Sequence, residues 1–283
     1  MDDTRILRDL LARHGFRFSK SMGQNFLTDS GILSAIADAS GADKTCGVLE
    51  IGPGAGTLTA HLARRAAAVA AVELDRALLP VLAETLEGFP NVEIVHGDAL
   101  KLDLNTLAGE KFPGLTPIVC ANLPYNITTP MLEKLVGASA FRSVTVLLQK
   151  EVAHRLAAPP GSPDGGAFSL FLQYHMTAEC LFDVPRTAFI PAPHVDSAVL
   201  RCIRRDVPPV RVDDEAFFFR VVRGGFLLRR KTLPNSLAAA LPEFSKEDIR
   251  RTMESCGLPD TVRGERLTLD DFANLAKALC KQE

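Results

Sequence analysis

The sequence of 283 residues lacks several features that would identify a broad class of protein. It has no run of about 20 apolar residues, which a helix needs to cross a bilayer. Its six cysteines form neither a CxxC pair nor a cluster with histidine, which argues against disulfides and structural zinc. The first residues alternate charged and apolar types at helical spacing, unlike a secretory signal. We therefore expect a cytoplasmic protein without a metal site.

The sequence also lacks a net excess of either charge, since 32 basic and 34 acidic residues give a net charge of −2. The basic residues are nevertheless grouped. One group lies near the N-terminus and comprises Arg5, Arg8, Arg13, Arg17 and Lys20. Another lies between residues 201 and 231 and includes Arg220, Arg223, Arg229, Arg230 and Lys231. Such grouping can produce one basic face that suits phosphate contacts, although solvated helix faces would give the same counts.

Short apolar runs alternate with amphipathic stretches through the first two thirds of the chain. The runs that predict strands are residues 47–51, 69–74, 92–96, 118–121 and 144–149. Helical patterns lie between them at 58–65, 78–87 and 129–136. This alternation predicts a Rossmann-like α/β fold with a mostly parallel sheet, and the nearly continuous apolar runs indicate helices on both of its faces. Two later runs, 179–184 and 195–203, are joined by a proline-rich turn and predict an antiparallel hairpin at the end of the sheet.

The pattern changes to helices alone after residue 206. The helical segments are 213–226, 233–240, 246–255 and 268–279. Ser245 with Asp248, and Thr268 with Asp271, have the spacing of capping boxes. The sequence therefore predicts a catalytic domain over residues 1–206 and a small all-α domain over residues 207–283.

The tetrapeptide Asn122-Leu123-Pro124-Tyr125 carries the most specific chemistry. The Asn122 oxygen and a backbone carbonyl next to Pro124 can accept both N–H groups of a planar amine, and this turns its lone pair toward an electrophile. Tyr125 can lie on the face of a nucleobase. The alternative is an ordinary loop, because Asn and Pro favour turns.

A strand that runs into a glycine-rich turn predicts a cofactor site. The turn has GxGxG spacing, with Glu50 followed by Gly52, Gly54 and Gly56. Such a turn can bind a dinucleotide, and Glu73 could then bind ribose hydroxyls. The glycine spacing, the carboxylate of Glu50 and a second acid at Asp98, where the adenine amine would lie, favour S-adenosylmethionine instead. Glu73 and Asp98 could also be merely polar strand ends.

Taken in order, these motifs resemble the ribosomal RNA adenine N6,N6-dimethyltransferases, the KsgA/Dim1 family, in its bacterial form. The segments that carry the resemblance are 20–27, 50–56, 73–75, 97–99, 122–126, 189–197 and 229–233. Two departures touch no proposed chemical group: Met22 in place of a common leucine, and residues 165–168 in place of a tyrosine-bearing loop.

The resemblance implies transfer of methyl groups from S-adenosylmethionine to two adjacent adenines in the 3′-terminal hairpin of small-subunit rRNA, each modified twice. The expected cofactor contacts are Asn25, Leu27, Glu50, Gly52, Gly54, Gly56, Glu73, Leu74, Asp98, Ala99 and Asn122. The expected catalytic residues are Asn122, Pro124, Tyr125 and Phe189. Tyr125 and Phe189 would sandwich the target base, although Phe189 could equally be a core residue. The basic segment 220–231 resembles the family's C-terminal segment, which helps engage the small ribosomal subunit, and we expect a monomer that acts on a pre-30S particle.

Two other classes of function compete with this interpretation. One is an enzyme with a different substrate: a large-subunit rRNA methylase of the resistance type, or a DNA or protein-amide methylase. Leu123 and the basic segment ending in Arg229-Arg230-Lys231-Thr232 favour the small-subunit enzyme. The other is a non-catalytic ribosome-assembly factor, in which we would expect loss of the acidic cofactor residues.

Overall fold

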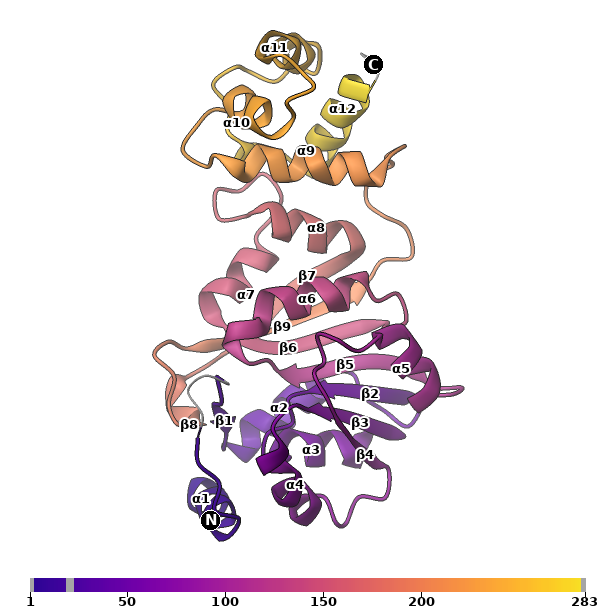
Figure 1. The fold of residues 1–283 in the computed structure, drawn as a ribbon, viewed down its shortest axis with the longest axis vertical. Helices are drawn as coiled ribbons and strands as arrows, with labels where there is room; N and C mark the ends of the chain where they lie inside the picture. Colours follow the sequence, from indigo (N-terminus) through magenta and orange to yellow (C-terminus); the bar gives the residue numbers. More distant parts are fainter. Residues whose placement is uncertain (1–2, 19–22, 281–283) are drawn as a thin grey trace. The chain divides into compact units, whose positions relative to one another are not determined.

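The computed structural model describes residues 3–18 and 23–280, and these group into two compact units (Figure 1). The first unit comprises Met1–Ala153 and Ala178–Arg204, and the second comprises His154–Thr177 and Arg205–Glu283. The division at residue 204 lies close to the predicted boundary at 206, but residues 154–177 group with the second unit rather than the first. Lys20, Ser21 and Met22, which belong to the segment 20–27 that carries part of the resemblance, lie outside the described residues.

The described strands of the first unit form a seven-stranded sheet in the order β4-β3-β2-β5-β6-β9-β7. Their bounds are β2 (Cys46–Ile51), β3 (Ala68–Glu73), β4 (Val92–His96), β5 (Thr116–Asn122), β6 (Ser143–Gln149), β7 (Met176–Val184) and β9 (Ser197–Arg204). The pairs from β4 to β6 are parallel, and β9 pairs antiparallel with β6. The predicted mostly parallel sheet with an antiparallel end is confirmed.

In the described part of the first unit, two α-helices precede the first parallel strand and four lie between the parallel strands, as the βαβ pattern predicts. Their bounds are α1 (Asp3–Arg13), α2 (Ser30–Ala39), α3 (Thr57–Arg65), α4 (Leu79–Thr85), α5 (Leu104–Lys111) and α6 (Thr128–Gly137). Ile36 of α2 and Leu62 of α3 pack against Val48 of β2 on one face of the sheet. The alternate strand residues, such as Leu49 and Val119, are also buried, so both faces are covered.

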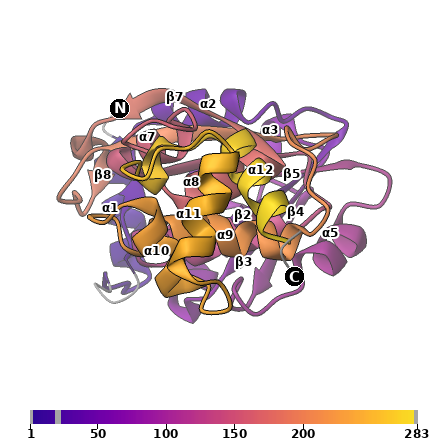
Figure 2. The same cartoon turned by 90° about the horizontal axis from the view of Figure 1, so that it is seen from above.

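Apart from the first two residues of β7, the regular secondary structure of the second unit is helical in its described part (Figure 2). It contains α8 (Ala167–His175), α9 (Glu215–Leu227), α10 (Leu233–Ala240), α11 (Lys246–Ser255) and α12 (Leu269–Cys280), while α7 (Lys150–Ala157) enters it from the first unit. Phe218 and Phe272 are among the fully buried side chains of its core. Both predicted capping boxes are present, because Asp248 N donates to Ser245 Oγ and Asp271 N donates to Thr268 Oγ1, while each aspartate accepts from the backbone N–H of its cap. None of the helices in the described ranges is long and apolar enough to span a membrane.

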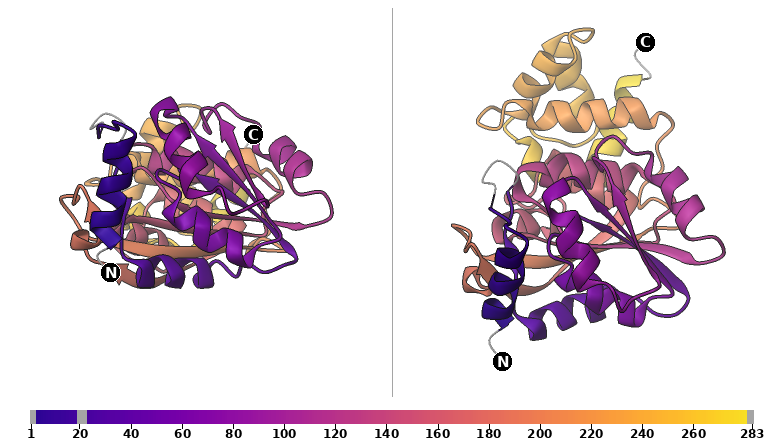
Figure 3. Two further views of the ribbon diagram at one scale, coloured as in Figure 1. Left: turned by 90° about the horizontal axis from the view of Figure 1, so that it is seen from below. Right: turned by 60° about the horizontal axis from the view of Figure 1, so that its bottom comes forward.

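A small two-stranded sheet joins two segments that lie far apart in the described sequence. β1 (Phe26–Leu27) pairs antiparallel with β8 (Phe189–Ile190), with Leu27 opposite Phe189. Figure 3 shows the indigo N-terminal segment running beside the β8 region. Thr28 strengthens the junction, since its N–H and its hydroxyl donate to Ala188 O at 2.9 and 3.1 Å. The pairing connects the segment around Gln24 and Asn25, which precedes α2, to the loop that precedes β9.

Candidate active site

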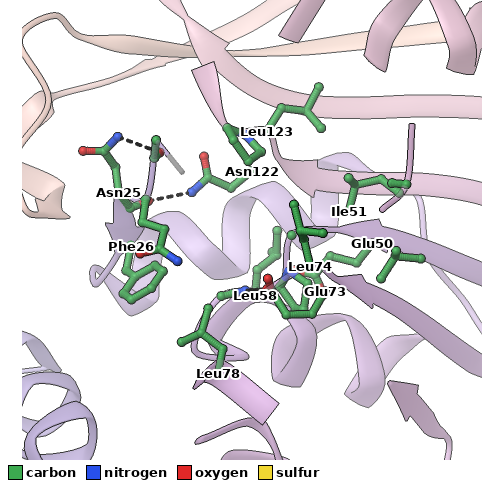
Figure 4. Close-up of a pocket in the computed structure, with 18 of the residues that line it drawn as sticks. Asn25, Phe26, Glu50, Ile51, Leu58, Glu73, Leu74, Leu78, Asn122 and Leu123 are labelled. Carbon is green, nitrogen blue, oxygen red and sulfur yellow. Dashed lines mark hydrogen bonds between the residues drawn. The ribbon is translucent and has the colours of Figure 1, made fainter. Parts of the chain in front are cut away.

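A cavity of 370 Å³ lies at the carboxyl ends of the parallel strands in the first unit (Figure 4). Most residues predicted to bind the cofactor line it: Asn25, Leu27, Glu50, Gly52, Gly54, Glu73, Leu74, Asp98, Ala99 and Asn122. Pro124 and Tyr125 line it as well. This edge of an open α/β sheet is where such folds bind ligands, because the loops after the strands meet there.

The glycine turn after β2 needs glycine for conformation and for space. Gly52, Gly54 and Gly56 have φ values of 67°, 61° and 82°, a region that other residues rarely adopt. A Cβ on Gly54 would also lie 2.9 Å from the ring of Phe26. Gly56 departs from its predicted role: it does not line the cavity but precedes α3, where a Cβ would meet Leu82 at 3.1 Å.

Replacing Gly54 by Ala is expected to lower cofactor affinity by on the order of tenfold or more, since one steric conflict and one strained residue cost about 1–3 kcal/mol. Isothermal calorimetry with S-adenosylmethionine measures the effect. Gly41→Ala is the matched control, because Gly41 has a similar φ of 71° but open space around its Cβ position. If both variants bind the cofactor equally, the contact with Phe26 has no role in the site.

Glu73, at the end of β3, stabilises this turn through hydrogen bonds from the backbone. Its Oε2 accepts a hydrogen bond from Gly54 N at 3.2 Å, and its Oε1 accepts one from Asp75 N at 2.7 Å. The side chain is buried, and burial raises the pKa of Glu73 while these two backbone N–H groups oppose the rise. Each carboxylate oxygen keeps a further lone pair, so Glu73 can still accept from ligand hydroxyls.

Glu50 supplies an acceptor that the protein itself leaves unsatisfied. The residue is 1% exposed, and its Oε2 has no hydrogen-bond partner in the part of the chain that the structure describes. Burial raises the pKa of Glu50 to about 8, the neighbouring Thr59 hydroxyl opposes the rise, and the nearby Glu73 charge adds to it. A buried acceptor without a partner is costly, so this oxygen suits a ligand that brings a cationic N–H donor.

Asp98 and Leu74 border the cavity after β4 and β3. Asp98 Oδ1 accepts from Leu100 N at 3.0 Å, and its Oδ2 lies 3.6 Å from Lys101 Nζ. Leu74 is 53% exposed while it lines the cavity, so it offers an apolar surface beside the acid. Glu73 and Asp98, which could have been merely polar strand ends, therefore border the same cavity.

Asn122 is held in one orientation at the end of β5. Its Nδ2 donates to Asn25 O at 3.0 Å, and Asn25 Nδ2 in turn donates to Gly23 O at 3.1 Å (Figure 4). Because the amide nitrogen is engaged, Asn122 Oδ1 is the atom presented as an acceptor. The Pro124 carbonyl already accepts from Ile127 N at 3.1 Å and Thr128 Oγ1 at 3.2 Å, which favours the preceding Leu123 carbonyl as the second acceptor.

The family model for ribosomal RNA adenine dimethylase matches residues 15–281. The chain belongs to this family. It is therefore an rRNA methyltransferase, and methyltransferases of this family use S-adenosylmethionine as the methyl donor.

Individual members of the family are similar over nearly the full chain. Ribosomal RNA small subunit methyltransferase A of Geobacillus sp. (strain WCH70) is 50% identical, with 96% of this chain and 95% of that protein covered. The protein of the same name from Streptococcus pneumoniae (strain P1031) is 48% identical, with coverages of 98% and 97%. A solved dimethyladenosine transferase from Plasmodium falciparum superposes with a TM-score of 0.76 at 25% identity, covering 91% of this chain and 98% of that one. The 23S rRNA methyltransferase ErmE gives 0.68 at 25%, with coverages of 90% and 99%.

Of the two aromatic residues expected to sandwich the target base, one borders the cavity and the other does not. Tyr125 lines the cavity, and its hydroxyl lies 2.6 Å from Ser197 Oγ. Phe189 is only 2% exposed, does not line the cavity and packs in the core with Leu27. Phe189 is therefore a core residue in this structure, and its ring does not border the cavity.

The residues expected to bind RNA follow one another on α9 and the turn after it in the second unit. Arg220 is paired with Glu243 at 2.6 Å and lies over the ring of Phe217. The others are exposed and comprise Arg223, Arg229, Arg230 and Lys231. Leu227 and Leu228 beside them are 56% and 39% exposed, so the dimethylase presents cations and apolar side chains together here.

Proposed function

We propose that this dimethylase modifies N6 of two adjacent adenines in the 3′-terminal hairpin loop of small-subunit rRNA, giving N6,N6-dimethyladenosines. The observation that carries the proposal is the fixed amide of Asn122, which lines a cavity bordered by three acids. The name of the relatives that are about 50% identical supports the small subunit as the source of the substrate. The large-subunit alternative is not favoured.

The donor set of the cavity fits S-adenosylmethionine. Glu50 Oε2 would accept from the ammonium group, Glu73 from the ribose hydroxyls and Asp98 from the adenine amine. The bound cofactor supplies an electrophilic methyl group on a sulfonium sulfur, which is already a good leaving group. Asn25, Leu27 and Leu74 would supply further contacts along the same cavity.

The protein's own residues would act mainly by positioning the adenine. Asn122 Oδ1 and the Leu123 carbonyl would accept the two N–H groups of the amine, while Tyr125 stacks on the ring. The target base must leave its stack, which is easier in a hairpin loop than in a helix. No strong base is required, because the amine proton becomes acidic once the nitrogen is alkylated. Orientation and fixed dipoles then provide most of the acceleration.

In the second round of transfer the amine has one N–H left. One of the two acceptors, Asn122 Oδ1 or the Leu123 carbonyl, must then release the amine while the other keeps the nitrogen in place. We infer that the same cavity serves both rounds, with the first methyl group taking the position of the N–H that it replaced.

Mass spectrometry of rRNA tests the proposal directly. Undermethylated small subunits are incubated with the protein and the methyl donor, and dimethyladenosine is expected near the 3′ end of the rRNA. Modification confined to large-subunit rRNA would identify a resistance-type methylase instead. No modification of either RNA, with normal binding to small subunits, would identify an assembly factor.

The exposed cations after α9 are proposed to contact the phosphates of a pre-30S particle, with the dimethylase acting as a cytoplasmic monomer. Replacing Arg223, Arg229, Arg230 and Lys231 by Ala is expected to weaken binding and to reduce its salt dependence. Each phosphate that the protein no longer neutralises lowers the slope of log affinity against log salt by roughly 0.7–0.9. Filter binding at several salt concentrations measures both quantities.

Lys246→Ala with Arg263→Ala is a suitable control for the basic segment, since both residues are exposed cations of the second unit outside it. This control should leave the salt slope unchanged. An equal decrease of the slope per charge removed in the control would mean that overall charge, rather than the segment after α9, determines binding.

A further inference from the structure

A buried serine outside the cavity holds one of the residues that line it. Ser197 is the first residue of β9 and is 0% exposed. Its Oγ lies 2.6 Å from the hydroxyl of Tyr125, and either group can donate. Ser197 does not border the cavity, whereas Tyr125 does.

We propose that Ser197 is a positioning residue that fixes the ring of Tyr125 in the orientation that receives the target base. The inference rests on the proposed function, in which Tyr125 stacks on adenine. It adds a residue that touches neither the cofactor nor the substrate and acts through the tyrosine alone.

The position of Ser197 is rigid, as an anchor requires. Its backbone pairs with Gln149 in the antiparallel register of β9 and β6. The preceding residue, Asp196, accepts a bond from Lys150 N at 3.0 Å through its carbonyl and one from Arg186 N at 2.9 Å through Oδ1. Asp196 thus closes the loop that ends at Ser197, and the backbone that carries the serine hydroxyl is held in place.

The backbone end of Tyr125 is fixed as well. Tyr125 begins the 3-10 helix Tyr125–Ile127, and the preceding Pro124 carbonyl accepts from Ile127 N and Thr128 Oγ1. With the hydroxyl held by Ser197, both ends of the side chain are restrained before any RNA arrives. Because folding already orders the ring of Tyr125, binding of the RNA does not include the entropy cost of ordering it.

The hydroxyl of Tyr125 is occupied on the side of β9, so it is not the atom that touches the base. Burial raises the pKa of Tyr125, which keeps the phenol neutral and argues against a phenolate base. The hydroxyl therefore explains why tyrosine rather than phenylalanine stands at this position: the ring stacks and the hydroxyl orients it.

Removing either hydroxyl should have the same effect, and removing both should add nothing. In single-turnover assays with saturating cofactor, Tyr125→Phe, Ser197→Ala and the double variant are each expected to lose on the order of tenfold in methyl transfer, equivalent to about 1.4 kcal/mol. Cofactor affinity should not change. A normal rate in Ser197→Ala would overturn the proposal. A loss of rate in Tyr125→Phe much larger than that in Ser197→Ala would also overturn it, if the two losses add in the double variant.

Thr145→Val is the matched control for loss of a buried hydroxyl from the sheet. Thr145 lies in β6 beside β9, is 0% exposed, and its Oγ1 has no hydrogen-bond partner among the described residues. This variant should keep the normal rate. An equal loss in Thr145→Val would show that damage to the core, not the bond to Tyr125, lowers transfer.

Tyrosine fluorescence can report directly on the motion of the Tyr125 ring. The chain has no tryptophan and two tyrosines, so in Tyr174→Phe protein only Tyr125 emits. Ser197→Ala in this background should lower the fluorescence anisotropy of Tyr125, because the ring gains local motion. Unchanged anisotropy would overturn the proposal. Absence of methylation by the wild-type protein would instead refute the proposed function, and the anisotropy test would still stand.

Discussion

Asn122→Ala is expected to lower methyl transfer by on the order of a hundredfold to a thousandfold, the loss seen when one preorganised hydrogen-bonding group of an active site is removed. The alanine has no oxygen to accept an N–H of adenine, so the lone pair is no longer turned toward the methyl donor. Cofactor affinity should change little, because the buried acids at Glu50 and Glu73 remain. Single-turnover assays and calorimetry measure the two quantities separately.

Asn122→Asp gives a second test of the same amide. The carboxylate keeps an acceptor oxygen but places a second oxygen against Asn25 O, where Nδ2 now donates at 3.0 Å. We expect a loss intermediate between wild type and alanine. If Asn122→Ala retained near-normal transfer, the assigned role of this residue would be wrong.

The stability of the protein should fall as the pH rises from 4.5 to about 8, and Glu50 is the main cause. Its pKa is raised from 4.5 to about 8, so in this window the folded protein keeps a proton that the unfolded chain releases. The loss is up to roughly 1.4 kcal/mol per pH unit, and the raised pKa of Glu73 acts in the same direction. Glu50→Gln removes the charge at nearly constant shape, so it should flatten this slope and be more stable than wild type near pH 8.

Urea unfolding across this pH window measures the slope. Glu87→Gln is the control, since Glu87 is exposed and its replacement should leave the slope unchanged. The same proton has a consequence for ligand binding: a cationic group against Glu50 favours the charged carboxylate, so cofactor binding should release a proton and tighten as the pH rises. A slope in Glu50→Gln equal to that of wild type would show that Glu50 is not protonated in the folded state.

The fold was predictable because its signals are local. The apolar runs and the helical patterns between them predicted the parallel sheet. The short polar motifs at the strand ends predicted that Glu73 and Asp98 border the cofactor site. Gly56 was assigned to the cofactor because its spacing matches that of Gly52 and Gly54, but spacing does not reveal that its missing Cβ makes room for Leu82.

The residues that sequence reasoning missed or placed differently depend on contacts between distant segments. Phe189 lies in a motif that resembles a base-binding segment, yet its burial follows from pairing with Leu27, in a strand too short to leave a periodic signal. Ser197 ends the motif 189–197, but that motif does not show that its hydroxyl lies beside Tyr125. A hydrogen bond between residues so far apart in the chain has no signature in either local sequence.

The pairing of β1 with β8 links the two sides of the cavity that fix Asn122 and Tyr125. One side of this small sheet continues from Asn25, which fixes Asn122, and the other leads to Ser197, which holds Tyr125. Both sides are already fixed in the absence of ligand, so the pairing lets one short sheet hold the acceptor and the stacking ring in place together. A substitution that breaks the β1–β8 pairing is therefore expected to loosen Asn122 and Tyr125 at the same time, although neither residue belongs to that sheet.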